Sequence, residues 1–79
     1  MIIPMQIRAA RALLDISQAE LAEKSGLSKT GIANIEAGKT DPKASTLTAI
    51  QRALEAAGIR FIGETGVELV TPPAPSPQA

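Results

Sequence analysis

The stretch QAELAEKSGLSKTGIANI, residues 18–35, decides how this chain folds. Before it, Ser17 stands three residues ahead of Glu20, the spacing of a capping box that starts a helix. Gly26 is a helix stop signal, and Ser28 is a candidate N-cap only two residues later. The stretch therefore predicts two short helices joined by a tight turn.

Such a tight pair of helices makes four demands on the sequence. It needs a small residue where the helices cross, a glycine at the turn, an apolar residue after it, and branched apolar residues that hold the second helix. The residues that meet these demands in order are Ala22, Gly26, Leu27, Ile32 and Ile35. These matches favour a helix-turn-helix, and an ordinary helical hairpin is the alternative.

Helical periodicity continues on both sides of this unit. A first helix is expected over residues 5–14, and Asp15 ends it. A fourth helix is expected to run to Gly58, and its start is open between two N-cap candidates, Asp41 and Ser45. The helical part of the chain is therefore residues 1–58.

The periodicity changes after Gly58. Residues 59–62 and 67–70 are apolar and rich in β-branched side chains, and Gly-Glu-Thr-Gly separates them. A hairpin with a left-handed Gly66 is expected, with Arg60 diagonal to Glu68. Since a lone hairpin is barely stable in water, it must lie on the helices or pair with another chain.

Composition excludes several classes of protein. Eight basic residues balance eight acidic ones, and the chain has no Cys and no His. Disulfides, thiolate or imidazole metal sites and cysteine nucleophiles are therefore excluded, and no nucleophile–base arrangement suggests an enzyme. We expect no cofactor and no metal. Without a signal peptide or an apolar run that spans a bilayer, a cytoplasmic protein without membrane contact is expected.

Residues 18–28, with IEAGKT at residues 35–40, resemble the lambdoid phage repressor and Cro family, the XRE-type helix-turn-helix. The resemblance covers roughly residues 7–54. It implies a mainly α fold, a compact four-helix lambda-repressor-like domain whose third helix enters the DNA major groove. Here a short C-terminal β-strand or hairpin, residues 59–70, stands in place of the family's usual fifth helix, and a Pro-rich disordered tail is expected at residues 71–79.

The resemblance and the helix geometry together assign candidate site residues. The outward face of the third helix is expected to contact DNA bases through Lys29, Thr30, Ala33 and Asn34. Phosphate contacts are expected from Gln18, Ser28, Gly38, Lys39, Thr40 and Lys43. Arg11 and Glu36 match a structural ion pair of the family. Gly31 lies inside the third helix, and two explanations for a glycine there remain open. It permits a close approach to DNA, or it reflects simple drift of the sequence.

The strand segment is expected to form a dimer element at residues 59–70, as a sheet across a two-fold axis. Its dimerisation residues are Ile59, Phe61, Ile62, Val67, Leu69 and Val70. The alternative is a hairpin within one chain. The sequence thus predicts a sequence-specific transcriptional regulator, a homodimeric repressor that reads a palindromic operator on double-stranded DNA. An antitoxin that also binds a toxin protein is the runner-up, and a protein-interaction adaptor without DNA is the third reading.

Overall fold

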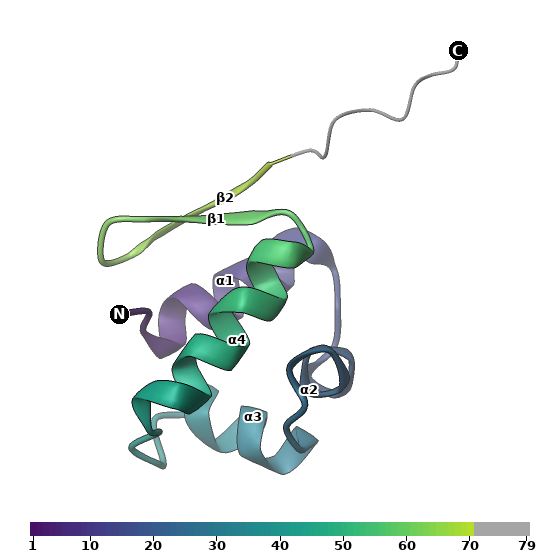
Figure 1. Cartoon of the computed structure of the whole chain (residues 1–79), viewed down its shortest axis with the longest axis vertical. Coiled ribbons are helices and arrows are strands. Elements are labelled where there is room, and N and C mark those ends of the chain that lie inside the picture. Colours follow the sequence, from purple (N-terminus) through teal and green to yellow (C-terminus); the bar gives the residue numbers. More distant parts are fainter. Residues whose placement is uncertain (71–79) are drawn as a thin grey trace.

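Four helices and a β-hairpin follow one another in the computed structural model, which describes residues 1–70 (Figure 1). The elements are α1 (Pro4–Leu14), α2 (Gln18–Ser25), α3 (Lys29–Glu36), α4 (Ala44–Ala56), β1 (Ile59–Ile62) and β2 (Gly66–Leu69). The predicted mainly helical fold with a C-terminal hairpin is confirmed. The predicted tail, residues 71–79, lies outside the described residues. Within residues 1–70, no helix has both the length and the apolar character to span a bilayer.

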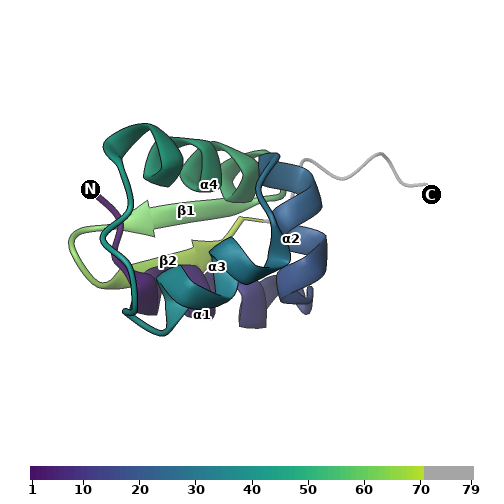
Figure 2. The same ribbon diagram turned by 90° about the horizontal axis from the view of Figure 1, so that it is seen from below.

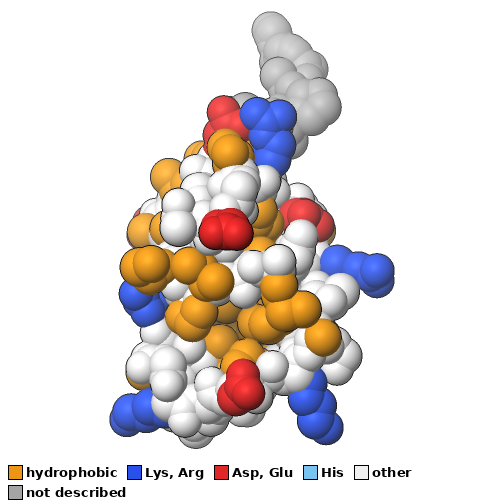
Figure 3. Space-filling model, turned by 90° about the vertical axis from the view of Figure 1, so that its left-hand side faces the viewer, with side chains coloured by type: hydrophobic (Ala, Val, Ile, Leu, Met, Phe, Trp, Pro, Cys, Tyr) orange, Lys and Arg blue, Asp and Glu red, His pale blue; other side chains and the backbone are white. Residues whose placement is uncertain are grey.

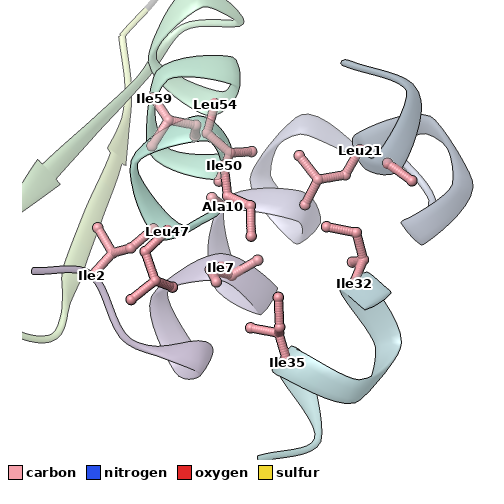
Figure 4. Close-up of a cluster of buried hydrophobic side chains, with 11 residues drawn as sticks. Ile2, Ile7, Ala10, Leu21, Ile32, Ile35, Leu47, Ile50, Leu54 and Ile59 are labelled. Carbon is pink, nitrogen blue, oxygen red and sulfur yellow. The ribbon is translucent and has the colours of Figure 1, made fainter. Parts of the chain in front are cut away.

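The core lies where the four helices meet (Figure 4). Its largest fully buried apolar side chains are Ile7, Leu21, Ile32, Ile50 and Leu54. Each such side chain contributes about 1.5–3 kcal/mol to folding by leaving water. Of the residues expected to hold the helix pair together, Ala22, Ile32 and Ile35 are buried in the same cluster, and Leu27 is half-buried against it.

The two ends of α2 are formed as the sequence predicted. The Glu20 N–H donates to Ser17 Oγ at 3.0 Å, and the Ser17 N–H donates to the Glu20 carboxylate at 2.9 Å. At the other end Gly26 is left-handed, with φ of 76°, which a side chain would disfavour. Because the turn is this short, α3 begins only three residues after Gly26.

The start of α4 differs from both predicted positions. Lys43 is the N-cap, Ala44 is the first helical residue, and no side chain caps the helix. Neither Asp41 nor Ser45 has the predicted role. Since a cap contributes only about 1 kcal/mol, the buried face of α4 outweighs it in placing the helix start.

The hairpin forms as predicted, but its turn does not. Gly63 is the left-handed residue, with φ of 60°, whereas Gly66 is not left-handed. Gly66 is needed for another reason, because a Cβ there would lie 2.8 Å from the Ile62 carbonyl oxygen. In the observed register Arg60 lies directly opposite Glu68, and the two form an ion pair.

The hairpin packs on α1 and α4 within the same chain. Figure 2 shows β1 beside α4 and β2 beside α1. Ile59 is part of the core, and Phe61 and Val67 are half-buried against it. These three predicted dimerisation residues therefore stabilise the single chain. The other three predicted dimerisation residues, Ile62, Leu69 and Val70, are exposed.

One buried polar side chain holds the hairpin on α1. Gln6 is 1% exposed. Its side-chain oxygen accepts from the Ile3 N–H at 3.0 Å, and its amide donates to the carbonyls of Gly66 at 3.1 Å and Gly63 at 3.4 Å. Since buried polar groups cost free energy unless they are paired, Gln6 specifies where the turn lies.

We expect Gln6→Ala to lower the free energy of unfolding by about 1–3 kcal/mol, because it removes hydrogen bonds from partly buried backbone groups. Urea denaturation measures the change, and amide exchange should quicken in the hairpin first. Gln51→Ala is the matched control, since the Gln51 amide only bonds the exposed Glu55 carboxylate. Equal losses in the two variants would contradict the role given to Gln6.

Candidate nucleic-acid interface

The outward face of α3 follows from its buried face. Ile32 and Ile35 point into the core, so the residues between them and at the helix start face away from it. The predicted base-contact residues lie there: Lys29 and Thr30 are exposed, and Ala33 and Asn34 are half-exposed. α3 thus presents these four side chains together along one helix face.

The first turn of α3 is capped by Ser28. The Gly31 N–H donates to Ser28 Oγ at 2.9 Å, and a Cβ at Gly31 would lie 3.1 Å from that oxygen. Such a contact is tight, so the capping hydroxyl would have to shift if a side chain were added. The cap therefore favours glycine at this position by local geometry alone.

The predicted phosphate-contact loop follows α3. Lys39, Thr40 and Lys43 are all exposed there. Two backbone N–H groups of this loop are already bonded within the chain: the Gly38 N–H donates to the Ile35 carbonyl oxygen at 3.1 Å, and the Lys39 N–H donates to the Asn34 carbonyl oxygen at 2.9 Å. Because these bonds close the end of α3, any phosphate contact from this loop falls chiefly to its side chains.

A buried ion pair ties α3 to α1. Arg11 Nε donates to Glu36 Oε2 at 2.7 Å, and Arg11 Nη2 donates to Glu36 Oε1 at 2.8 Å. The Glu36 side chain is 3% exposed and that of Arg11 is 22% exposed. Two parallel bonds of this kind fix distance and orientation together. The arrangement holds the last turn of α3 against the first helix.

Gln18 joins the same cluster from the start of α2. Its amide donates to Glu36 Oε1 at 3.0 Å. The Glu36 carboxylate thus connects three helices, with Arg11 on α1 and Gln18 on α2. This brace fixes the angle at which α3 projects from the molecule. Gln18 is half-exposed, so the position also permits contact with a ligand at the surface.

Arg8 is a member of this cluster that the sequence analysis missed. Its guanidinium donates to the Glu36 backbone carbonyl at the end of α3. A cation there also interacts favourably with the negative end of the helix dipole. Its sequence signal was its position, one turn before Arg11 on the same helix face. Arg8 is exposed, so it adds positive charge beside α3.

The cluster sets the protonation of Glu36. Burial opposes ionisation of the carboxyl, but the hydrogen bonds from Arg11 and Gln18 and the nearby arginine charges outweigh it. The pKa of Glu36 is consequently lowered from its ordinary value of 4.5. The hydrogen bond with Glu36 in turn raises the pKa of Arg11. Both groups are charged over the whole physiological range.

We expect this pair to lose its stabilising effect in acid. The pKa of Glu36 is lower in the folded chain than in the unfolded one, so the gain is complete above the unfolded pKa, 4.5. It is lost as the pH falls through the folded pKa. The free energy of unfolding of the parent minus that of Glu36→Gln should therefore stay constant between pH 7 and about pH 5, and shrink as the pH falls below the unfolded pKa. An unchanged difference in urea titrations would contradict the assignment.

Comparison with known proteins gives two matches. Residues 7–57 match the helix-turn-helix family. An uncharacterized HTH-type transcriptional regulator, y4dL, from Sinorhizobium fredii is 42% identical over 53 residues, which is 67% of this chain and 27% of that protein. The chain therefore spans about a quarter of the length of this relative. The matched residues include α2, α3 and the whole Arg11–Gln18–Glu36 cluster.

Proposed function

Because the chain belongs to the XRE-type helix-turn-helix family over residues 7–57, we propose that it is a DNA-binding transcriptional regulator, a dimeric repressor that reads a palindromic operator. The observation that carries the proposal is the brace at Glu36. It holds α3 through α1 and α2 and leaves the outer face of α3 free. A helix that enters the major groove of DNA must project from the protein at a fixed angle.

Base recognition is assigned to four side chains on α3. Lys29 would donate to guanine O6 and N7, and Asn34 would pair with adenine in the major groove. Thr30 and Ala33 would contact a thymine methyl group. Residues at the helix start approach base edges most closely, and Lys29 and Thr30 are exposed there.

Phosphate contacts are assigned to the residues on either side of α3. Ser28, Lys39, Thr40 and Lys43 offer hydroxyl and ammonium donors, and Gln18 keeps a half-exposed amide. Gly38 lines this surface, with its N–H already bonded within the helix end. Few cations take part, so each copy alone should bind DNA weakly.

Selection of bound sequences from a random pool of duplexes, with the full chain, tests the function. We expect one enriched palindrome and binding that weakens steeply with salt. Binding indifferent to salt, or no retained duplex at all, would support the adaptor reading instead.

We expect Lys39→Ala and Lys43→Ala to weaken binding to all duplexes alike. Each lost phosphate contact should reduce the slope of log affinity against log salt by about 0.9. Fluorescence anisotropy at several salt concentrations measures this. Arg52→Ala removes an equal charge from an exposed position of α4 and is the control. If Arg52→Ala reduces the slope of log affinity against log salt as much as Lys39→Ala and Lys43→Ala do, the assignment of phosphate contacts to Lys39 and Lys43 is wrong.

A further inference from the structure

The two arginines of α1 are bonded very differently. Arg11 directs Nε and Nη2 to the Glu36 carboxylate and Nη1 to the Ile16 carbonyl oxygen at 3.1 Å. Bonds within the chain therefore engage each nitrogen of its guanidinium. Arg8 is exposed, and within residues 1–70 its guanidinium donates only to the Glu36 backbone carbonyl. A guanidinium has five N–H donors, so most of the donors of Arg8 face solvent.

The bond to Glu36 places the Arg8 guanidinium at the end of α3. Glu36 is the last residue of that helix, and the loop that holds Lys39 and Lys43 follows it. The Lys39 N–H donates to the Asn34 carbonyl oxygen, two residues before the one that accepts from Arg8. Both oxygens lie in the last turn of α3. Arg8 therefore reaches the same end of α3 as the loop does, from the side of α1.

The cluster at this end carries surplus positive charge. Arg8 and Arg11 face one carboxylate, that of Glu36, which leaves one positive charge at the surface. α1 contains no acidic residue that offsets it. Figure 3 shows Lys and Arg side chains at both margins of the end that holds α3 in Figure 1, with Asp or Glu between them. Positive charge thus flanks α3 although the chain as a whole is neutral.

The dimensions of DNA decide what a side chain in this position contacts. A helix about 10–12 Å across fills a major groove about 12 Å wide. α3 has 8 residues and is about 12 Å long, so both of its ends come close to the phosphates at the edges of the groove. A side chain that projects beside the helix from a neighbouring element therefore meets phosphates and not base edges. Arg8 projects in this way.

We propose that Arg8 contacts a DNA phosphate, so that one arginine both holds the end of α3 and binds the nucleic-acid backbone beside it. The proposal rests on the proposed function for DNA as the ligand, and it does not need the operator. A planar guanidinium matches two oxygens of a phosphate. The bond to Glu36 already restricts the Arg8 side chain, so less conformational freedom is lost on binding.

Fluorescence anisotropy of the full chain with a mixed-sequence duplex at several salt concentrations tests the contact. Arg8→Gln should reduce the slope of log affinity against log salt by about 0.9 for each bound copy, which is about fivefold weaker binding at about 0.15 M salt. Arg8→Lys keeps the charge and should keep the slope. Arg52→Gln makes the same change at an exposed position of α4 and is the matched control.

A purely structural role of Arg8 at the end of α3 predicts a different result. Arg8→Gln and Arg8→Lys would then both lower the midpoint of thermal unfolding, and both would weaken binding by the same factor at every salt concentration. Such an unchanged slope overturns the proposal. So does an Arg8→Gln variant whose slope falls no further than that of Arg52→Gln.

Duplexes with a single uncharged methylphosphonate locate the contact on the selected sequence. One such substitution should weaken binding of the parent but not of Arg8→Gln, because that charge pair is already broken. A substitution at a different phosphate should lose its effect in Lys39→Ala. If every substitution weakens the parent and Arg8→Gln equally, the proposal is wrong.

The anisotropy measurements also separate this proposal from the proposed function. A parent that binds no duplex overturns both. A parent that binds the mixed-sequence duplex with a steep salt dependence, loses slope in Arg8→Gln and selects no palindrome would support the Arg8 contact and count against the operator-reading repressor alone.

Discussion

Arg11→Met is expected to lower the free energy of unfolding by about 3–5 kcal/mol, because it leaves the Glu36 carboxylate buried and unpaired. Glu36 is 3% exposed, so little water can replace the lost guanidinium. A domain of this size has about 4–10 kcal/mol of stability in all, and the variant should be partly unfolded under native conditions. Circular dichroism during urea and thermal unfolding measures the loss.

Two further variants separate charge burial from simple loss of packing. The double variant Arg11→Met with Glu36→Leu should recover part of the loss, since no charge is then left unpaired. Arg60→Ala breaks the exposed pair with Glu68, whose side chains are 66% and 47% exposed, and should cost at most about 1 kcal/mol. If Arg11→Met costs no more than Arg60→Ala, the brace at Glu36 does not support α3 as argued.

Lys29→Ala combined with Asn34→Ala is expected to abolish sequence preference. Each good base contact contributes about 1–3 kcal/mol of discrimination, so the two together should cost roughly thirtyfold or more in specific affinity. Neither side chain bonds another residue within residues 1–70, so the fold should keep its thermal stability. Anisotropy with the selected duplex and with a scrambled one measures both affinity and preference.

The outcome separates base recognition from general attraction to DNA. Binding to the scrambled duplex should change little with Asn34→Ala alone, which removes no charge. Arg52→Ala, a charge removed from α4, should leave the preference intact. If the double variant keeps both its specific affinity and its preference, α3 does not read the sequence through this face.

The helices could be predicted because their signals are local. The capping box at Ser17 and the glycine stop at Gly26 act within a few residues, and both form as predicted. Asp15 was expected to end α1, and it does so with φ of 56°, in the left-handed region that Asp tolerates better than most residues. The apolar spacing of α3 likewise placed Ile32 and Ile35 in the core. Such features need no knowledge of the rest of the chain.

The errors and omissions arise from contacts between distant segments. Neither N-cap candidate of α4 is used, because packing of the buried face outweighs a cap of about 1 kcal/mol. The turn of the hairpin was misplaced because Gln6, some 60 residues earlier, bonds its carbonyls. Arg8 was missed because its partner is a backbone carbonyl, which every residue has and no pattern marks.

The amino-acid sequence by itself determined the helix-turn-helix unit, its inward residues and the outward face of α3, because helical periodicity and capping act over a few residues. Only the tertiary structure decided that the strands pair within the chain, that Ile59 belongs to the core and that, within residues 1–70, one edge of β2 has no partner strand. A strand of alternating apolar residues suits a partner from its own chain or from another equally well. The bonds of Gln6 and the packing on α1 and α4 make that choice, and they form only once the helices have met.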